Sequence, residues 1–559
     1  MRLCFCALAL FSTLLLLEGS AFAKDKTRAD AGTHYAVASA NPDATDAGMR
    51  VLAVGGSAVD AAVAMQMVLG VVEPQSSGLG GGAIALYQAA QERRMKAFDG
   101  LSRSPSSFDP NSGAAAGFSH SGAAVGVPGS LRMLEVMHRR YGRLPWSTLF
   151  QRAIELAETG FSVSPYLARS LAAASRAGME VPVWLTDGAG KTATEGASVR
   201  NPELAATLRT VATNGADALY VNLADHIVAA TQHTSLMGRV TVDDIGSYKA
   251  VEREPLCLPL RQHVLCSFPP PSYGGIVVLE ILGILEKRPP PLYSFLDFDF
   301  IHQFIEAGRL AEADRMDLVG DPDMGPVPAR QVLDPDHLQA RAALIQSRSV
   351  IGNPTTGSSG PKCARVEHAP EPSTSQLAVV DAWGNALAMT TTINVNFGAW
   401  LTVGGFFLND AMTNFAMPLA GGCAANAPAG NKRPETSMAP VIATGTNGSV
   451  VLIGGSAGAG EIVDYVAQTV IELLAGKNPV EALDDGHVST ARAPYSGTAG
   501  VVELEYGRAV SQLARPLIAL GHKVKIVPMQ SGTAFIVRRQ GHWDGATDPR
   551  RDGMFASSP

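Results

Sequence analysis

The sequence carries little charge for its length. Charged residues make up 17% of the 559, the formal net charge is −7, and lysine and arginine are scattered instead of clustered. Nucleic acids and other anionic polymers are therefore not expected as partners. Hydrophobic residues reach 46%, which is typical of a globular chain with a large core and not of a fibrous or tail-rich protein.

Long apolar runs are missing as well. The run at 3–17 is shorter than the roughly 20 residues that a transmembrane helix needs, and no later stretch is long enough. This run follows Arg2 and leads into Ser-Ala-Phe-Ala at 20–23, the pattern of a secretory signal. We expect residues 1–23 to be removed, which gives a periplasmic or secreted protein without a membrane span.

Cysteine is scarce, and no metal-binding pattern is present. Two of the six cysteines fall within the expected signal, and their loss leaves Cys257, Cys266, Cys363 and Cys423. In an oxidising compartment the first two can close a local loop, although the sequence does not fix the pairing. Their spacing matches no zinc motif, and the twelve histidines show no ligand spacing, so we expect no metal and no cofactor.

A phosphate-binding motif is absent too. The glycine run at 78–82 has no Gly-Lys-Ser/Thr ending, and a strand at 83–87 follows it in place of a helix. We interpret this run as a loop in which two backbone segments approach closely. Before it, Ser57 and Asp60 have the spacing of a reciprocal N-cap for a buried helix that reaches residue 69.

What the sequence does offer is a threonine at the start of a strand. Thr374 follows a Pro- and Ser-rich junction and precedes the alternating residues 376–380. A threonine hydroxyl is a weak nucleophile, but a free α-amino group titrates at about 7.7–8.0 and can accept its proton. Cleavage between Ser373 and Thr374 would supply both groups. The alternative interpretation is an ordinary threonine at a strand edge.

The pattern after Thr374 is one of paired strands with helices between the pairs. Turns are indicated at 381–385 and 446–448, helices at 461–474 and 507–520, and strands at 523–527 and 533–537. This order favours a layered α/β sandwich over a doubly wound sheet. Before Thr374, a helix at 298–316 carries charged residues at spacings of three, which suits surface ion pairs: Glu306, Arg309, Glu312 and Arg315.

Several blocks in one order resemble the γ-glutamyltransferase family of N-terminal-nucleophile hydrolases, also called glutathione hydrolases. They are GGSAVDAA at 55–62, VVEPQSSG at 71–78, VGVPG at 125–129, PPPSYGG at 269–275, KRP at 432–434 and GATDPR at 545–550. The resemblance implies a four-layer αββα fold of the α+β type and self-cleavage before Thr374. It also implies a large subunit, 24–373, that stays associated with a small subunit, 374–559.

The resemblance also implies roles for individual residues. Thr374 is the nucleophile, and Thr392 matches the second threonine that bonds its amino or hydroxyl group. The backbone N–H groups of Gly458 and Ala459 match the oxyanion site, where the family usually has two glycines. The positions that match the site for the substrate's glutamyl carboxylate are Asn394, Thr436 and Ser437.

Two departures from the family affect the amino-acid end of the substrate. Leu101 stands in place of the arginine that pairs with the α-carboxylate, and Arg103 is the nearest cation that can reach back. Asn414 replaces the acidic residue that holds the α-ammonium group, and Ala411 replaces a glutamine or glutamate. The segment 416–430, which matches the lid over the pocket, is short and lacks the lid tyrosine.

Three functions remain open from the sequence. The first is a self-cleaving amidohydrolase or acyltransferase that takes the γ-glutamyl group of glutathione-like compounds and passes it to water, an amino acid or a peptide. The second keeps this chemistry but acts on an acyl group without the α-ammonium, for example a glutaryl group, because of Leu101 and Asn414. The third is a binding protein that kept the fold and lost turnover.

Overall fold

The computed structural model describes residues 35–92, 94–109, 111, 118–187, 189–288, 297–316, 318–348, 373–416, 425–490 and 500–558. The expected signal, Cys363, Cys423 and a large part of the segment 416–430 lie outside these ranges.

Two large sheets form the centre of the molecule. The first has the order β20 (Met554–Ser557), β1 (Ala36–Ser39), β9 (Ser375–Val380), β10 (Ala386–Thr392), β2 (Gly82–Gln88), β3 (Met95–Gly100), β6 (Val251–Arg253). The second has the order β19 (His542–Thr547), β18 (Ala534–Arg539), β14 (Val450–Gly455), β13 (Val441–Gly445), β8 (His263–Ser267), β7 (Leu256–Leu260). Neighbouring strands are antiparallel throughout both sheets.

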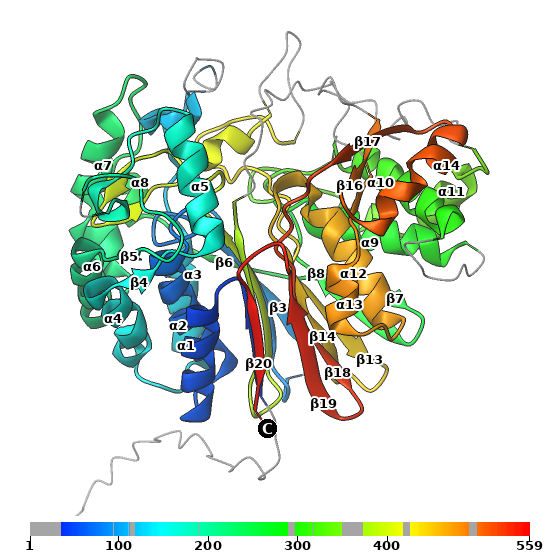
Figure 1. Ribbon diagram of the computed structural model, residues 1–559, viewed down its shortest axis with the longest axis horizontal. Helices are drawn as coiled ribbons and strands as arrows, with labels where there is room; N and C mark the ends of the chain where they lie inside the picture. The colour runs from blue at the N-terminus through cyan, green and yellow to red at the C-terminus, as the bar shows by residue number, and fades with distance from the viewer. Residues whose placement is uncertain are drawn as a thin grey trace, which may run out of the picture.

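A helical layer covers the outer face of each sheet, so that the order is helices, sheet, sheet, helices (Figure 1). On the side of the first sheet lie α1 (Pro42–Ala53), α2 (Ala58–Val72), α3 (Ser130–Tyr141), α4 (Gln151–Thr159), α5 (Pro165–Arg176), α6 (Pro202–Asn214), α7 (Ala224–Gln232) and α8 (Val242–Gly246). On the other side lie α9 (Gly274–Glu286), α10 (Phe298–Arg315), α11 (Pro335–Leu344), α12 (Ile462–Leu474), α13 (Pro479–Asp484) and α14 (Ala514–Ala519). The predicted four-layer sandwich is confirmed.

Short strands complete the structure. They are the pairs β4 (Phe161–Ser162) with β5 (Ser198–Val199) and β11 (Thr402–Val403) with β12 (Phe406–Phe407), and the sheet of β15 (Val488–Ser489), β16 (Val501–Glu505) and β17 (Lys523–Val527). The single helix predicted at 507–520 is instead a 3-10 turn at Ala509–Leu513 followed by α14. Pro516 explains the difference, because proline fits the first turn of a helix and not its interior.

The local sequence accounts for the central helix α2. Ser57 Oγ accepts a hydrogen bond from Asp60 N, and the Asp60 carboxylate accepts one from Ser57 N, which is the predicted capping box. Apolar residues on nearly every face allow α2 to be buried between α1, α4 and the first sheet. Asp381, in the turn between β9 and β10, accepts a hydrogen bond from Ala58 N and so fixes this helix against the strands that start at Thr374.

The prediction that helix α10 exposes a charged face is wrong. Glu306 is 0% exposed, Arg309 9% and Arg315 3%. Their ion pairs are internal: Arg309 bonds Glu306 at 3.0 Å, and Arg315 bonds both Glu312 and Glu435. Spacing of three places residues on one helix face, but the layers decide whether that face is buried, and α10 packs against α9, α11 and α14.

Cys257 and Cys266 form a disulfide across the hairpin of β7 and β8, where they are directly opposite each other.

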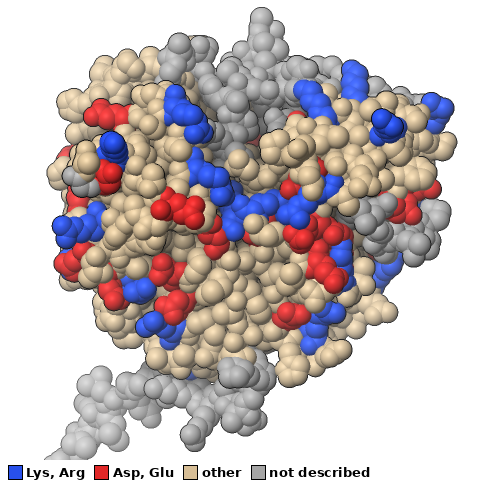
Figure 2. Space-filling model, in the orientation of Figure 1, with Lys and Arg blue, Asp and Glu red and all other residues tan. Residues whose placement is uncertain are grey.

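On the face shown in Figure 2, lysine and arginine form a short band across the middle with acidic side chains beside it. Of the helices in the described ranges, none combines the length and the apolar character needed to cross a bilayer.

Candidate active site

The hairpin of β9 and β10 brings two threonine hydroxyls together. Ser375 is opposite Thr391 in the antiparallel register, so the next pair outward is Thr374 and Thr392. The Thr374 hydroxyl donates a hydrogen bond to Thr392 Oγ1 at 3.1 Å. Thr392 Oγ1 also accepts from Asn394 N at 2.8 Å, which fixes its position. The predicted pairing of these two threonines across the sheet is therefore present.

The backbone at Thr374 is strained. Its φ of +102° lies in a region that residues with a β-branched side chain rarely adopt, at a cost of about 1–3 kcal/mol. Neighbouring groups hold it there: Arg551 Nη1 donates to the Thr374 carbonyl oxygen at 2.8 Å, and Ser373 Oγ donates to Gln75 O at 2.8 Å. Opening the Ser373–Thr374 bond would release this strain.

The glycine-rich loop that ends at β2 lies directly against the threonine pair. A Cβ on Gly81 would stand 2.3 Å from the Thr392 carbonyl oxygen, and one on Gly80 would stand 2.1 Å from Phe407 O. Side chains at these positions are excluded, because such contacts are far inside van der Waals distance. The loop thus has the close backbone approach that the sequence predicted, and it packs against the end of β10.

Two charged residues beside Thr374 were not found by the sequence analysis. Glu73 is fully buried and accepts a hydrogen bond from Ser375 Oγ at 2.6 Å. Burial raises the pKa of Glu73 to about 7, and Arg551 opposes this shift. Glu73 lies in the VVEPQSSG block and Arg551 directly follows the GATDPR block. Their position in or beside a family block was the available signal.

The candidate oxyanion loop follows β14. Gly458 has φ +133°, and Ala459 has φ +56°, in the left-handed region that an alanine adopts at some cost. Ser437 Oγ donates to the Ala459 carbonyl oxygen at 2.6 Å and ties this loop to the pocket segment. A Cβ on Gly455 would stand 2.6 Å from the Gln376 side chain, so the end of β14 lies against the start of β9.

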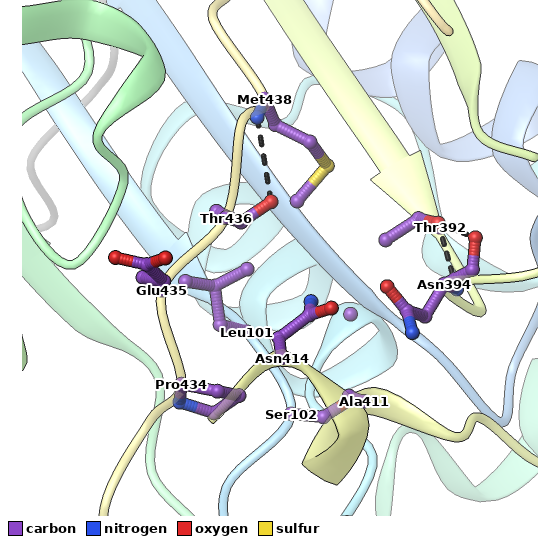
Figure 3. A pocket seen from close by; sticks show the side chains of 11 residues that line it. Leu101, Ser102, Thr392, Asn394, Ala411, Asn414, Pro434, Glu435, Thr436 and Met438 are labelled. Carbon is purple, nitrogen blue, oxygen red and sulfur yellow. Dashed lines mark hydrogen bonds between the residues drawn. The ribbon is translucent and has the colours of Figure 1, made fainter. Parts of the chain in front are cut away.

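A small pocket, open to solvent, adjoins Thr392. Figure 3 shows Asn414 between Leu101 and the amide group of Asn394. None of the lining residues is a lysine, arginine or histidine. The lining consists of Gly82, Leu101, Ser102, Thr392, Asn394, Ala411, Asn414, Pro434, Glu435, Thr436 and Met438.

The charged groups near this pocket have protein partners. Glu435 bonds Arg315 at 3.1 Å. The Arg103 guanidinium donates to Asp244 O at 3.2 Å and Ser247 Oγ at 3.1 Å, and Arg103 is not among the lining residues. Asn394, Asn414 and Thr436 are thus brought together around the pocket, Ser437 lies beside the oxyanion loop, and Arg103 lies apart. The substrate-binding role of Arg103 stays a prediction.

Removal of the Thr392 hydroxyl gives a first test of this geometry. In Thr392→Ala, Thr374 Oγ1 loses its acceptor, and we expect kcat to fall about ten- to a hundred-fold with a smaller change in KM. Thr392→Ser keeps the hydroxyl and serves as the matched control. Steady-state kinetics on an amide that releases a coloured amine measure kcat and KM of both variants. An unchanged kcat in Thr392→Ala would exclude a role for this hydrogen bond.

Comparison with known proteins gives consistent matches over nearly the whole chain. The model of the family Gamma-glutamyltranspeptidase matches residues 44–558. A glutathione hydrolase proenzyme of Bacillus subtilis is 30% identical and covers 98% of this chain and 97% of its own length. The acylase ACY 1 proenzyme of a Pseudomonas strain is 32% identical, with 93% of each covered. Among solved structures, a cephalosporin acylase from Bacillus halodurans has a TM-score of 0.80 and 26% identity, over 94% of this chain and 96% of that one.

Proposed function

The chain belongs to the γ-glutamyltranspeptidase family of N-terminal-nucleophile amidohydrolases and acyltransferases, and we propose that it acts on amides whose acyl part lacks an α-ammonium group. The observation that carries this proposal is Asn414 in the pocket beside Thr392: the lining has no basic side chain, and its one carboxylate, Glu435, is bonded to Arg315.

The reaction begins with processing at Ser373–Thr374. Thr374 Oγ attacks the Ser373 carbonyl carbon, and the C–N bond then breaks, which frees the Thr374 α-amino group and leaves an ester on Oγ. Water hydrolyses this ester and restores the Thr374 hydroxyl. In the mature enzyme this amine takes the proton from Oγ as Oγ attacks the substrate carbonyl, and then gives it to the leaving amine. The N–H groups of Gly458 and Ala459 stabilise the oxyanion. Water or an acceptor amine then takes the acyl group from Thr374.

The pocket favours an acyl group that carries fewer charges than the zwitterionic γ-glutamyl group. Asn414 offers a substrate ammonium an amide oxygen in place of a carboxylate, and the nearby Glu435 is already bonded to Arg315. Leu101 offers a substrate carboxylate a methyl surface. Desolvation of either charge without a counter-ion is costly. The apolar side chains of Leu101, Pro434 and Met438 instead offer contact to a methylene chain, as in a glutaryl or similar acyl group.

A second candidate is the hydrolysis of glutathione-like γ-glutamyl compounds. It is favoured by Asn394 and Thr436, which line the pocket and correspond to the residues around the glutamyl carboxylate in the family. A binding protein without turnover is the third and weakest candidate, because the hydroxyl pair of Thr374 and Thr392 is present.

A panel of three anilides separates these candidates. We expect kcat/KM on a glutaryl or pentanoyl anilide to exceed that on the γ-glutamyl anilide by about tenfold or more, since one unpaired charge on burial costs at least 1–3 kcal/mol. Release of the aniline is followed by absorbance. A clear preference for the γ-glutamyl compound would establish the second candidate, and the absence of any acylation burst with all three would favour the third.

We also propose that the mature protein works outside the cytoplasm. The disulfide Cys257–Cys266 supports this location, because structural disulfides persist in oxidising compartments. The mature protein would then consist of residues 24–373 and 374–559, held together by the sheets that they share.

A further inference from the structure

Outside the active site, three side chains from three different helices converge on one point. Glu280 comes from α9, Asp314 from α10 and His337 from α11, which lie together in the second helical layer (Figure 1). His337 Nε2 is 3.2 Å from Glu280 Oε1 and 3.2 Å from Asp314 Oδ2. The three donor atoms all lie within 4.8 Å of one another. We propose that this cluster binds a divalent transition-metal ion of the Zn²⁺ type.

The distances suit a metal ion. Two donor atoms 3.2 Å apart, each about 2.1 Å from one ion, subtend an angle of about 100°, which lies between octahedral and tetrahedral geometry. One imidazole with two carboxylates is a ligand set that Zn²⁺ or Mn²⁺ accepts, whereas the imidazole disfavours Ca²⁺ and Mg²⁺.

Hydrogen bonds within the cluster leave one buried oxygen unsatisfied. Glu280 is 0% exposed, and its Oε2 has no hydrogen-bond partner among the described residues. His337 Nε2 lies at hydrogen-bonding distance from both Glu280 Oε1 and Asp314 Oδ2. A single N–H can donate to only one of these two oxygens at full strength. An ion at this point would give Glu280 Oε2 a partner, because a carboxylate can bind a metal ion through both oxygens.

Neighbouring residues orient one ligand of the cluster, and the partial exposure of another ligand lets an ion enter from solvent. Arg341 Nε donates to Asp314 Oδ2 at 2.6 Å, and its Nη2 donates to Oδ1, which orients this carboxylate. The His337 side chain is 29% exposed and gives an ion a path from solvent. The sequence showed no ligand spacing because the three residues lie on separate helices.

The test uses the full, processed protein after dialysis against a chelator. We expect Zn²⁺ to bind at one saturable site in calorimetry, to raise Tm by about 3 °C at a hundredfold excess over Kd, and to act far more strongly than Ca²⁺ or Mg²⁺. Glu280→Gln, which preserves shape, and His337→Gln are expected to weaken binding at least about tenfold. His233→Ala, at an exposed histidine, is the control and should leave binding unchanged.

Equal zinc affinity in the two cluster variants and in His233→Ala would overturn the proposal, as would the absence of saturable binding. A measurement on the unmodified protein is independent of how the variants fold. Zn²⁺ should protect His337 from acylation by diethyl pyrocarbonate, read by peptide mass spectrometry, while His233 stays reactive. Equal labelling of His337 with and without Zn²⁺ contradicts the site.

Discussion

A Thr374→Ala variant is expected to remain a single uncut chain and to lose amidase activity by about a million-fold, as when a nucleophile that acts as part of a unit is removed. The side chain of Thr374 is the proposed attacking group in both processing and turnover. Its hydroxyl is held 3.1 Å from Thr392 Oγ1 at a strained backbone position. Gel electrophoresis and mass spectrometry of the purified protein measure the first effect, and kinetics on the anilides measure the second.

Thr374→Ser is the matched control for this experiment. Serine keeps the hydroxyl and lacks only the methyl group, so this variant should still be cut and should retain measurable turnover. Sequencing of the wild-type protein from its amino ends should yield a chain that begins Thr-Ser-Gln-Leu. A Thr374→Ala protein that is still cut before residue 374, or that keeps full activity, would show that another group performs the chemistry.

Restoring charge to the pocket is expected to give the second large effect. In the double variant Leu101→Arg with Asn414→Asp, a cation and an anion would face the two charges of a γ-glutamyl group. Each charge-assisted hydrogen bond contributes about 1.5–3 kcal/mol. Two such bonds together contribute about 3–6 kcal/mol, so kcat/KM on the γ-glutamyl anilide should rise about 100- to 10,000-fold. The glutaryl anilide should gain from the arginine alone, because it has a carboxylate and no ammonium group.

The single variants separate the two contributions. Asn414→Asp should raise kcat/KM only for the γ-glutamyl anilide. Leu101→Arg should raise kcat/KM for the γ-glutamyl and glutaryl anilides, which bear a carboxylate, but not for the pentanoyl anilide. Leu101→Met conserves volume at this buried position, 5% exposed, and controls for packing. An unchanged order of the three substrates in the double variant would mean that the acyl group binds elsewhere.

The sequence predicted those parts of the site that depend on local pairing. The β9–β10 hairpin follows from the turn at 381–385 and the alternation after Thr374. Its register brings together Thr374 and Thr392, whose partnership the family resemblance implied. The capping box at Ser57 is equally local, since it connects residues close in sequence. The sequence offered Cys257 and Cys266 as a possible local loop but left the pairing open, and the structure joins them. A layered sandwich was accessible because strand pairs alternate with helices, whereas the four-layer order was implied by the family resemblance.

Features that depend on packing between distant segments were not predictable in this way. The charged residues of α10 have the spacing of a solvated face, and only the cover supplied by neighbouring helices makes Glu306 and Arg315 internal. Arg551 reaches the Thr374 carbonyl from a segment 177 residues further along the chain. The Glu280 cluster likewise joins three helices, and no short motif contains it.

The order of strands constrains how the two proposed subunits, 24–373 and 374–559, can fold. In the first sheet β1 and β2, from before residue 374, flank β9 and β10, from after it, and in the second sheet β8 pairs with β13. Each product alone would expose unpaired strand edges in the middle of both sheets. If they were synthesised as separate polypeptides, we therefore expect them to aggregate. The two parts would have to fold as one uncut chain, and the cut before residue 374 could be tolerated only after both sheets have formed.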